Sequence, residues 1–271
     1  MKILILGGTG LLGNAVGKYF INSNHDITLT YRNEMVIYGD KKKWVYFDAL
    51  KQSPLLVKEY DYVINCIGVI KPFMYNNLLD SIKLNSVFPW ELANICEKTN
   101  TRLFHITTDC VYSGKNGKYN EDSLHDALDD YGKSKSLGEP IEKCMVIRTS
   151  IIGEEIHKNA SLISWAKSQK GKQVNGFTHH LWNGITTIQY AKICEDIINN
   201  DWYNIGLFHV HAKDDVSKAQ MLNYFNEKYD LKLNIIETNK IGNPVDRTIR
   251  TTKDLCYKLE IPTVQKMINN I

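Results

Sequence analysis

Short apolar runs of four to six residues alternate with longer amphipathic stretches through the first half of the chain. Because these runs are mostly apolar, they are typical of parallel strands that are buried on both faces. The predicted strands are Lys2–Leu6, Asp26–Tyr31, Trp44–Phe47, Tyr62–Cys66, Arg102–Thr107 and Cys144–Thr149, and the predicted helices are Leu11–Ser23, Leu78–Lys98 and Tyr131–Glu139. This order predicts an α/β fold with a doubly wound, parallel Rossmann sheet.

The alternation weakens after about Ile151. Helical patterns at 160–169, 187–199 and 217–229 are mixed there with short strands at 207–210 and 233–236, and no linker rich in Pro, Gly or Ser precedes them. We therefore expect a Rossmann domain at residues 1–150. Residues 151–271 are expected to form mainly a smaller α/β lobe, with some segments returning to the Rossmann domain.

Composition narrows the functional classes. The chain has 271 residues, of which 43% are hydrophobic and 23% charged, as in ordinary globular proteins. Its net charge of +3 comes from scattered residues, whereas nucleic-acid binders usually show a clustered basic face. No apolar run reaches the roughly 18 residues that span a bilayer. We therefore expect neither a nucleic-acid partner nor a membrane partner.

The six cysteines include no Cys-x-x-Cys pair and have no His-x-His cluster beside them. A metal site is therefore not expected. The apolar part of the N-terminal stretch "MKILILGGTG" is too short for a signal peptide. These features predict a cytoplasmic protein with reduced thiols.

A glycine-rich turn follows the first predicted strand directly. The stretch "LGGTGLLG" has the spacing G-x-x-G-x-x-G and leads into a helix. In this context one glycine makes a tight turn, one lets backbone N–H groups approach a pyrophosphate, and one lets helix pack on strand. The candidate dinucleotide contacts in the turn are Gly7, Gly10, Leu11, Leu12 and Gly13.

The ends of the second and third strands bear on the choice of cofactor. Enzymes selective for NAD usually have an acidic residue after the second strand, but this chain has Tyr31 and Arg32. A guanidinium suits a 2′-phosphate, so we expect NADPH, with NADH as the alternative. Asp48, after the third strand, is a candidate adenine contact or an ordinary helix cap.

Tyr131 and Lys135 in "DDYGKSKSLGE" are four residues apart, on one face of a predicted helix. An ammonium beside a phenol lowers the pKa of the tyrosine. Such a tyrosine can protonate a carbonyl oxygen while a hydride reaches the carbon. The pair follows the glycine turn and the strand that ends in "TTD", so it is a candidate catalytic pair.

At this point the chain resembles an extended short-chain dehydrogenase/reductase, and within that superfamily the dTDP-4-dehydrorhamnose reductases. The matching stretches, in family order, are "GGTGLLG" at 7–13, "NCIG" at 65–68, "LNSVFPWELA" at 84–93, "TTDCVYSG" at 107–114, "YGKSKSLGE" at 131–139 and "VIRTSIIG" at 146–153. The resemblance implies reduction, with NADPH, of the 4-keto group of a nucleotide-linked 4-keto-6-deoxy sugar. That activity would serve deoxysugar biosynthesis for a surface polysaccharide or glycan.

The resemblance also implies roles for individual residues. Tyr131 would protonate the keto oxygen, Thr108 would hydrogen-bond it, and Lys135 would hold the nicotinamide ribose. Asn65 and the following residues would lie against the cofactor, and Asn85 would support the site. The remaining candidates are Cys66, Ile67 and Gly68 for the cofactor, and Asp109, Cys110, Trp182, Asn183, Arg247 and Arg250 for the nucleotide sugar, with both arginines at its diphosphate. A homodimer is left open.

Cys110 departs from the resemblance, because the rhamnose-type reductases typically have tyrosine there. GDP-fucose synthases and plant-type UDP-rhamnose synthases have a cysteine at this place, which implies an alternative: a combined 3,5-epimerase and 4-reductase. An epimerase also needs an acid partner, for which Lys172, His179 and His180 are candidates. A third alternative, of another class, is a catalytically silent, dinucleotide-binding regulatory subunit on the same fold.

Overall fold

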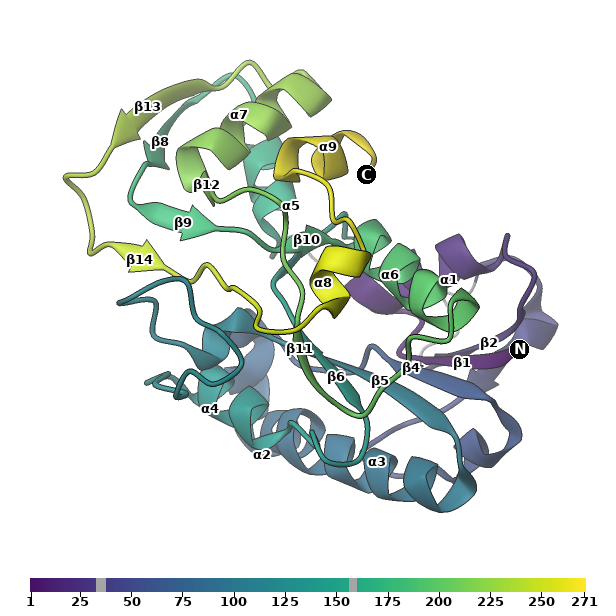
Figure 1. The fold of residues 1–271 in the computed structure, drawn as a ribbon. Coiled ribbons are helices and arrows are strands. Elements are labelled where there is room, and N and C mark those ends of the chain that lie inside the picture. Colours follow the sequence, from purple (N-terminus) through teal and green to yellow (C-terminus); the bar gives the residue numbers. More distant parts are fainter. Residues whose placement is uncertain (33–37, 156–159) are drawn as a thin grey trace.

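The computed structural model describes residues 1–32, 38–155 and 160–271 and centres on a seven-stranded sheet (Figure 1). The strands lie in the order β11-β6-β5-β4-β1-β2-β3, and every pair is parallel. Their bounds are β1 Lys2–Leu6, β2 Asp26–Tyr31, β3 Trp44–Tyr46, β4 Tyr62–Asn65, β5 Arg102–Thr107, β6 Met145–Arg148 and β11 Gly206–His209. The predicted doubly wound Rossmann sheet is confirmed.

Helices cover both faces of this sheet (Figure 1). One apolar core joins Ile3 and Ile5 of β1 to α1 (Leu11–Phe20) and α6 (Thr187–Asn199). A second joins Leu4 and Leu6 to α3 (Phe88–Thr99). Successive residues of β1 belong to different cores because successive side chains of a strand point to opposite faces of the sheet. Both α6 and β11 come after residue 150 but belong to the sheet and its helices.

The predicted long helix over 78–98 is interrupted. Helix α2 (Leu78–Ile82) passes through a π-helical segment, Lys83–Val87, into α3. Pro89 has no N–H to donate to the carbonyl one turn earlier, which favours such a bulge. The bulge places the fully buried Asn85 beside the sheet's carboxyl edge.

The rest of the chain after residue 150 forms small sheets with helices around them. A three-stranded sheet, β12-β9-β14, has β12 antiparallel and β14 parallel to β9, and two pairs, β8 with β13 and β7 with β10, are parallel. The bounds are β7 Ile151–Ile152, β8 Gln173–Phe177, β9 His180–Trp182, β10 Ile185–Thr186, β12 Val216–Ser217, β13 Asn234–Thr238, β14 Val245–Asp246, α5 Leu162–Ser168, α7 Lys218–Tyr229, α8 Leu255–Lys258 and α9 Val264–Asn269. None of the helices formed by the described residues is long and apolar enough to cross a bilayer.

Candidate functional site

The glycine turn has the shape that a pyrophosphate requires. Gly7 has a φ of 78°, which favours glycine, and a Cβ on Gly13 would lie 2.2 Å from the Gly7 carbonyl oxygen. Gly10 is the exposed N-cap of α1 and has no side chain to accept from the N–H groups of Leu11 and Leu12. The free N–H groups and the positive end of the helix dipole therefore fit an anion.

The residues at the ends of β2 and β3 are less clearly arranged for binding a cofactor. Tyr31 is half-buried, with its ring centroid 5.9 Å from that of Tyr46. Arg32 is exposed, as a contact to a 2′-phosphate requires, and the residues that follow it, 33–37, lie outside the described residues. Asp48 is buried, and its carboxylate accepts from the Leu50 N–H at 3.1 Å. The structure thus uses Asp48 as a turn cap.

The segment after β4 is held against the glycine turn from two sides. The Asn65 side chain accepts from the Ile67 N–H at 3.1 Å. The Asn85 amide both accepts from the Val69 N–H and donates to the Val69 carbonyl, each at 2.9 Å. A Cβ on Gly7 would lie 3.1 Å from the Ile67 side chain. Residues 66–68 are therefore fixed along the edge where the turn lies.

Thr108, Tyr131 and Lys135 converge at the carboxyl ends of β4 and β5. The Thr108 side chain lies close enough to the Tyr131 hydroxyl to lower the pKa of that hydroxyl, although burial outweighs this effect. The Lys135 ammonium donates to the Ile106 carbonyl at 3.2 Å and lies 4.0 Å from where a Cβ on Gly68 would be. The phenol, the hydroxyl and the ammonium thus point to one place beside the glycine turn.

Helix α4 (Asp130–Leu137) carries Tyr131 and Lys135, and hydrogen bonds anchor it at its start and middle. The Asp129 side chain caps it by accepting from the Gly132 N–H at 2.8 Å. From the π-helical segment, Asn85 donates to the Ser134 hydroxyl and the Ser86 hydroxyl donates to the Ser134 carbonyl. These bonds tie the helix to the π-helical segment beside the sheet edge.

Burial sets the protonation states of Tyr131 and Lys135. It raises the pKa of Tyr131, and nearby Cys110 and Asp109 add to the rise. It lowers the pKa of Lys135 to about 8. In the free protein the net effect on the pKa of Tyr131 is a rise, so burial outweighs any lowering of that pKa by a neighbouring group. Tyr131 keeps its proton at neutral pH, which is the form that a proton donor needs.

Asp109 and Cys110 continue the same edge beyond Thr108. The buried Asp109 carboxylate accepts from the Thr108 hydroxyl at 3.1 Å and interacts with the Cys110 thiol. Burial raises the pKa of Asp109, and burial together with Asp109 raises the pKa of Cys110 to about 12. Cys110 is therefore a protonated thiol that can donate a proton but is a poor base.

Two cationic side chains, Lys218 and Arg247, face Asp109 and Cys110 from the three-stranded sheet. We call this pair the cationic wall. Val245 pairs with His180 and Ser217 with Leu181, which brings Arg247 and Lys218 to the same region. Lys218, the first residue of α7, interacts electrostatically with Asp109, Cys110 and Arg247, and burial lowers its pKa. Among the ion pairs of the described residues none involves Lys218 or Arg247. Both cations are therefore available to an anionic ligand.

The cationic wall, Lys218 and Arg247, is tied to the loop after β5. The Arg247 guanidinium donates through Nε to the Tyr112 carbonyl at 3.0 Å and through Nη2 to the Ser113 carbonyl at 3.4 Å. Lys218 was missing from the sequence-based candidates. Its helix start was predicted, but strands as short as β12 and β9, whose pairing turns Lys218 toward the site, leave no signal in the sequence.

Three predicted substrate contacts have other roles. Both terminal nitrogens of Arg250 bind the Asp215 carboxylate. Asn183 is buried and bonds the backbone N–H and carbonyl of Ile249 at 3.0 and 2.9 Å. Trp182 is packed into the main core. These residues shape the lobe after residue 150, and the structure does not bring them to the catalytic set.

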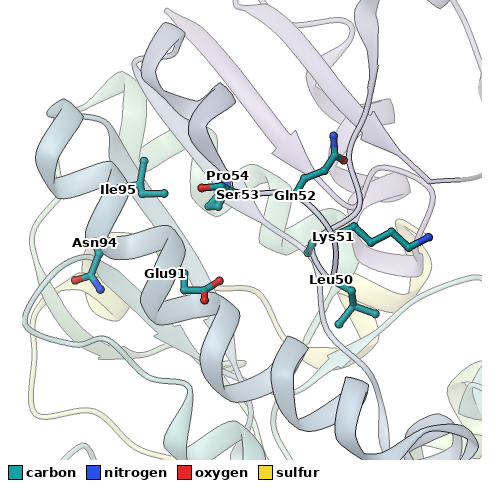
Figure 2. Close-up of a pocket in the computed structure, with 9 residues that line it drawn as sticks. Leu50, Lys51, Gln52, Ser53, Pro54, Glu91, Asn94 and Ile95 are labelled. Carbon is teal, nitrogen blue, oxygen red and sulfur yellow. The ribbon is translucent and has the colours of Figure 1, made fainter.

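A surface cavity of about 490 Å³ lies elsewhere, between the loop 49–54 and helix α3 (Figure 2). Glu91, Asn94 and Ile95 of α3 form one side of it. None of the catalytic or cationic side chains lines it, so it is not the candidate site. Within the described ranges, no group of three or more His, Cys, Asp or Glu side chains is placed to hold a metal ion.

The solved structures most similar in fold include nucleotide-sugar enzymes. A dTDP-4-dehydrorhamnose reductase from Clostridium acetobutylicum superposes with a TM-score of 0.73 at 19% identity, covering 100% of this chain and 98% of that one. The same enzyme from Bacillus anthracis, in complex with NADP, superposes with a TM-score of 0.76 at 16% identity, covering 99% and 97%. At these identities the likeness establishes the fold.

Sequence comparison points to two kinds of relative. The methionine adenosyltransferase 2 subunit beta of Danio rerio is 27% identical over 81% of this chain and 71% of its own. The dTDP-4-dehydrorhamnose reductase of Aggregatibacter actinomycetemcomitans is 26% identical over 80% of this chain and 75% of its own. A family described as the RmlD substrate binding domain matches residues 1–255. The chain therefore belongs to the RmlD substrate-binding domain family, within the extended short-chain dehydrogenase/reductases.

Proposed function

We propose that this chain is an NADPH-dependent reductase acting on the 4-keto group of a nucleotide-linked 4-keto-6-deoxy sugar. The observation that carries the proposal is the convergence of Tyr131, Thr108 and Lys135 at the edge of the glycine turn, with the Tyr131 hydroxyl protonated. A relative named as a dTDP-4-dehydrorhamnose reductase supports the substrate class. The product would serve the synthesis of a deoxysugar for a surface polysaccharide or glycan.

Each group of the catalytic set has a part in this reaction. NADPH, when bound, supplies the hydride to the carbonyl carbon. The Tyr131 hydroxyl and the Thr108 hydroxyl donate to the keto oxygen, and Tyr131 gives up its proton as negative charge develops there. Thr108 donates to Asp109 in the free protein, so it exchanges that bond when the substrate enters. The Lys135 ammonium, near Gly68, is placed to hold a ribose and to stabilise the phenolate after proton transfer.

The cationic wall would hold the other end of the substrate. A nucleotide sugar carries a diphosphate, and guanidinium and ammonium groups bind phosphate oxygens strongly. Arg247 is fixed through Tyr112 and Ser113, and Lys218 interacts electrostatically with Arg247, Asp109 and Cys110. A diphosphate bound here would leave its sugar next to Tyr131. Residues 151–271 would thus supply most of the substrate lobe, and residues 1–150 the cofactor domain.

A second candidate, the combined 3,5-epimerase and 4-reductase, is favoured by the position of Cys110. Its thiol is protonated and lies next to Tyr131 and Thr108, so it can act as the acid of an epimerisation. The base would have to come from the opposite wall. His180, the first residue of β9, interacts electrostatically with Lys218 and Arg247, whereas Lys172, the residue before β8, is exposed.

A third candidate is favoured by a different observation. Several relatives are named as methionine adenosyltransferase 2 subunit beta, at identities similar to that of the reductase. A dinucleotide-binding subunit without turnover therefore remains a separate hypothesis. It predicts NADPH binding but no oxidation of the cofactor by any keto sugar nucleotide.

One experiment separates the three candidates. The protein is mixed with NADPH and dTDP- or UDP-linked 4-keto-6-deoxyglucose in deuterated water, with and without a 3,5-epimerase, and the product is analysed by NMR. Oxidation only after the epimerase is added, or oxidation without deuterium at C3 and C5, supports the reductase. Deuterium at both carbons without added epimerase supports the dual enzyme. Cofactor binding without oxidation under every condition refutes both enzymes and supports the subunit.

A further inference from the structure

A buried arginine outside the catalytic set has every donor occupied. Arg148, at the end of β6, is 1% exposed. Its Nε and Nη2 bind the two Glu139 oxygens at 3.1 and 2.5 Å. Its Nη1 donates to the Tyr112 hydroxyl at 2.6 Å and to His209 Nε2 at 2.8 Å, and Nη2 also donates to His125 Nε2 at 2.7 Å. The five N–H donors of a guanidinium are therefore all used.

The two histidines must be neutral and have one tautomer. Because Arg148 donates to Nε2 of both rings, each ring has its proton on Nδ1. His209 then donates from Nδ1 to the Arg250 carbonyl at 2.8 Å, and His125 donates to the Ser136 hydroxyl at 2.6 Å. Burial, with Arg148 adding to it, lowers the pKa of His209 to about 4, which agrees with a neutral ring.

One side of this network is attached to the catalytic helix. Ser136, which accepts from His125, lies one residue beyond Lys135 in α4. Glu139 lies two residues beyond the last helical residue, Leu137. Arg148 thus holds the end of the helix that bears Tyr131 at two separate points.

The other side is attached to the segment that carries the cationic wall. Tyr112 accepts from Arg148 through its hydroxyl, and its backbone carbonyl accepts from Arg247 Nε at 3.0 Å. The Arg250 carbonyl is held through His209. A single guanidinium therefore connects α4 to residues 247–250, which come from distant parts of the chain.

Stability alone does not explain such a network. Replacing a buried ion pair by apolar side chains is often neutral or stabilising, because desolvation offsets most of the attraction. What a five-donor arrangement supplies is geometry, since a planar guanidinium fixes the directions of all its partners. The distance between Tyr131 and Arg247 is the quantity that these directions determine.

We propose that Arg148 is a positioning residue that sets the cationic wall at a fixed place relative to the catalytic helix, so that a sugar whose diphosphate is bound at Arg247 presents its keto group to Tyr131. The inference rests on the proposed function. It requires that Arg148 act through Arg247 on nucleotide binding and leave the cofactor site unchanged.

The test measures ligand binding by titration calorimetry, with dTDP, UDP and NADPH as separate probes. Arg148→Lys keeps the charge but has only three donors, and Tyr112→Phe removes one hydroxyl while retaining the ring that stacks on Tyr119. Arg102→Lys, at a part-exposed arginine paired with Asp201, is the matched control. Thermal unfolding of each variant shows that binding is measured on folded protein.

We expect Arg148→Lys to weaken binding of the preferred nucleotide by about fivefold, as for residues coupled in one network. Tyr112→Phe should weaken it in the same direction, NADPH affinity should stay within about twofold, and Arg102→Lys should bind like wild type. In an Arg247→Met background, Arg148→Lys should cause no further loss. Three results would overturn the proposal. The folded Arg148→Lys and Tyr112→Phe variants could both bind the nucleotide like wild type, or they could lose NADPH affinity to the same extent. Arg148→Lys could also weaken nucleotide binding just as much in the Arg247→Met background. Failure of the wild type to bind either nucleotide would instead refute the proposed substrate class.

Discussion

Gly10→Ala tests the cofactor cradle without disturbing the turn. Gly10 has a φ of −82°, which alanine adopts freely, and its added Cβ would lie 3.4 Å from the Gly7 carbonyl oxygen, its nearest neighbour. That contact is ordinary van der Waals distance. The added methyl group therefore has room in the free protein and meets only a ligand that approaches the helix N-terminus.

The structure allows the effects of Gly10→Ala on stability and on NADPH binding to be estimated. Alanine is a poorer N-cap than glycine, which costs about 0.5 kcal/mol of unfolding free energy and about 1–2 °C in Tm. A pyrophosphate bound to the N–H groups of α1 would be displaced by the methyl group, and we expect the Kd for NADPH to rise at least about tenfold, or about 1.4 kcal/mol.

The assay is fluorescence titration with NADPH beside thermal unfolding, and Gly13→Ala is the matched comparison. A Cβ on Gly13 would lie 2.2 Å from a backbone oxygen, so this variant should lose several degrees of Tm as well as cofactor affinity. Wild-type NADPH affinity in folded Gly10→Ala would refute the placement of the pyrophosphate at this turn.

Three further predictions follow from the site. Tyr131→Phe should lower kcat for keto-sugar reduction by at least about 100-fold while NADPH affinity stays within about twofold, since only the proton donor is lost. Lys218→Met should raise KM for the nucleotide sugar by about tenfold, whereas the exposed Lys213→Met should not; steady-state kinetics measures both. Burial lowers the pKa of His105 well below its usual value and that of His209 to about 4, so the unfolded chain takes up protons first. The free energy of unfolding should therefore be highest above about pH 6.5 and fall as the pH is lowered toward 4, as chemical denaturation at several pH values will show.

The sheet was predictable because its central strands β1, β4 and β6 are apolar runs that are buried almost throughout, whereas the edge strand β3 is largely exposed. Lys2–Leu6, Asp26–Tyr31 and Arg102–Thr107 have the predicted bounds. The helix break at 83–87 was missed, because Pro89 lies inside an otherwise regular amphipathic pattern. The short strands after residue 150 were mostly missed, since their partners are distant in the sequence and their side chains are mixed in polarity.

The site was predictable to the extent that its residues lie next to strands of the main sheet. Thr108, Tyr131 and Lys135 lie together because the helix and the strand ends meet at one edge. The roles of Arg250 and Lys218 could not be predicted from the sequence. One arginine is neutralised by Asp215 and one lysine is turned toward Asp109, and both outcomes depend on tertiary pairing that composition and spacing do not encode.

Hydride transfer itself gives the most direct test of the central claim. The wild-type protein is incubated with NADPH deuterated at the transferable C4 position and a dTDP- or UDP-linked 4-keto-6-deoxy sugar, with an epimerase present, and the product is analysed by mass spectrometry and NMR. The account predicts one deuterium at C4 of the sugar for each NADPH oxidised, and loss of that signal with Tyr131→Phe. Bound but unoxidised NADPH with every such sugar, or turnover that survives Tyr131→Phe, would contradict it.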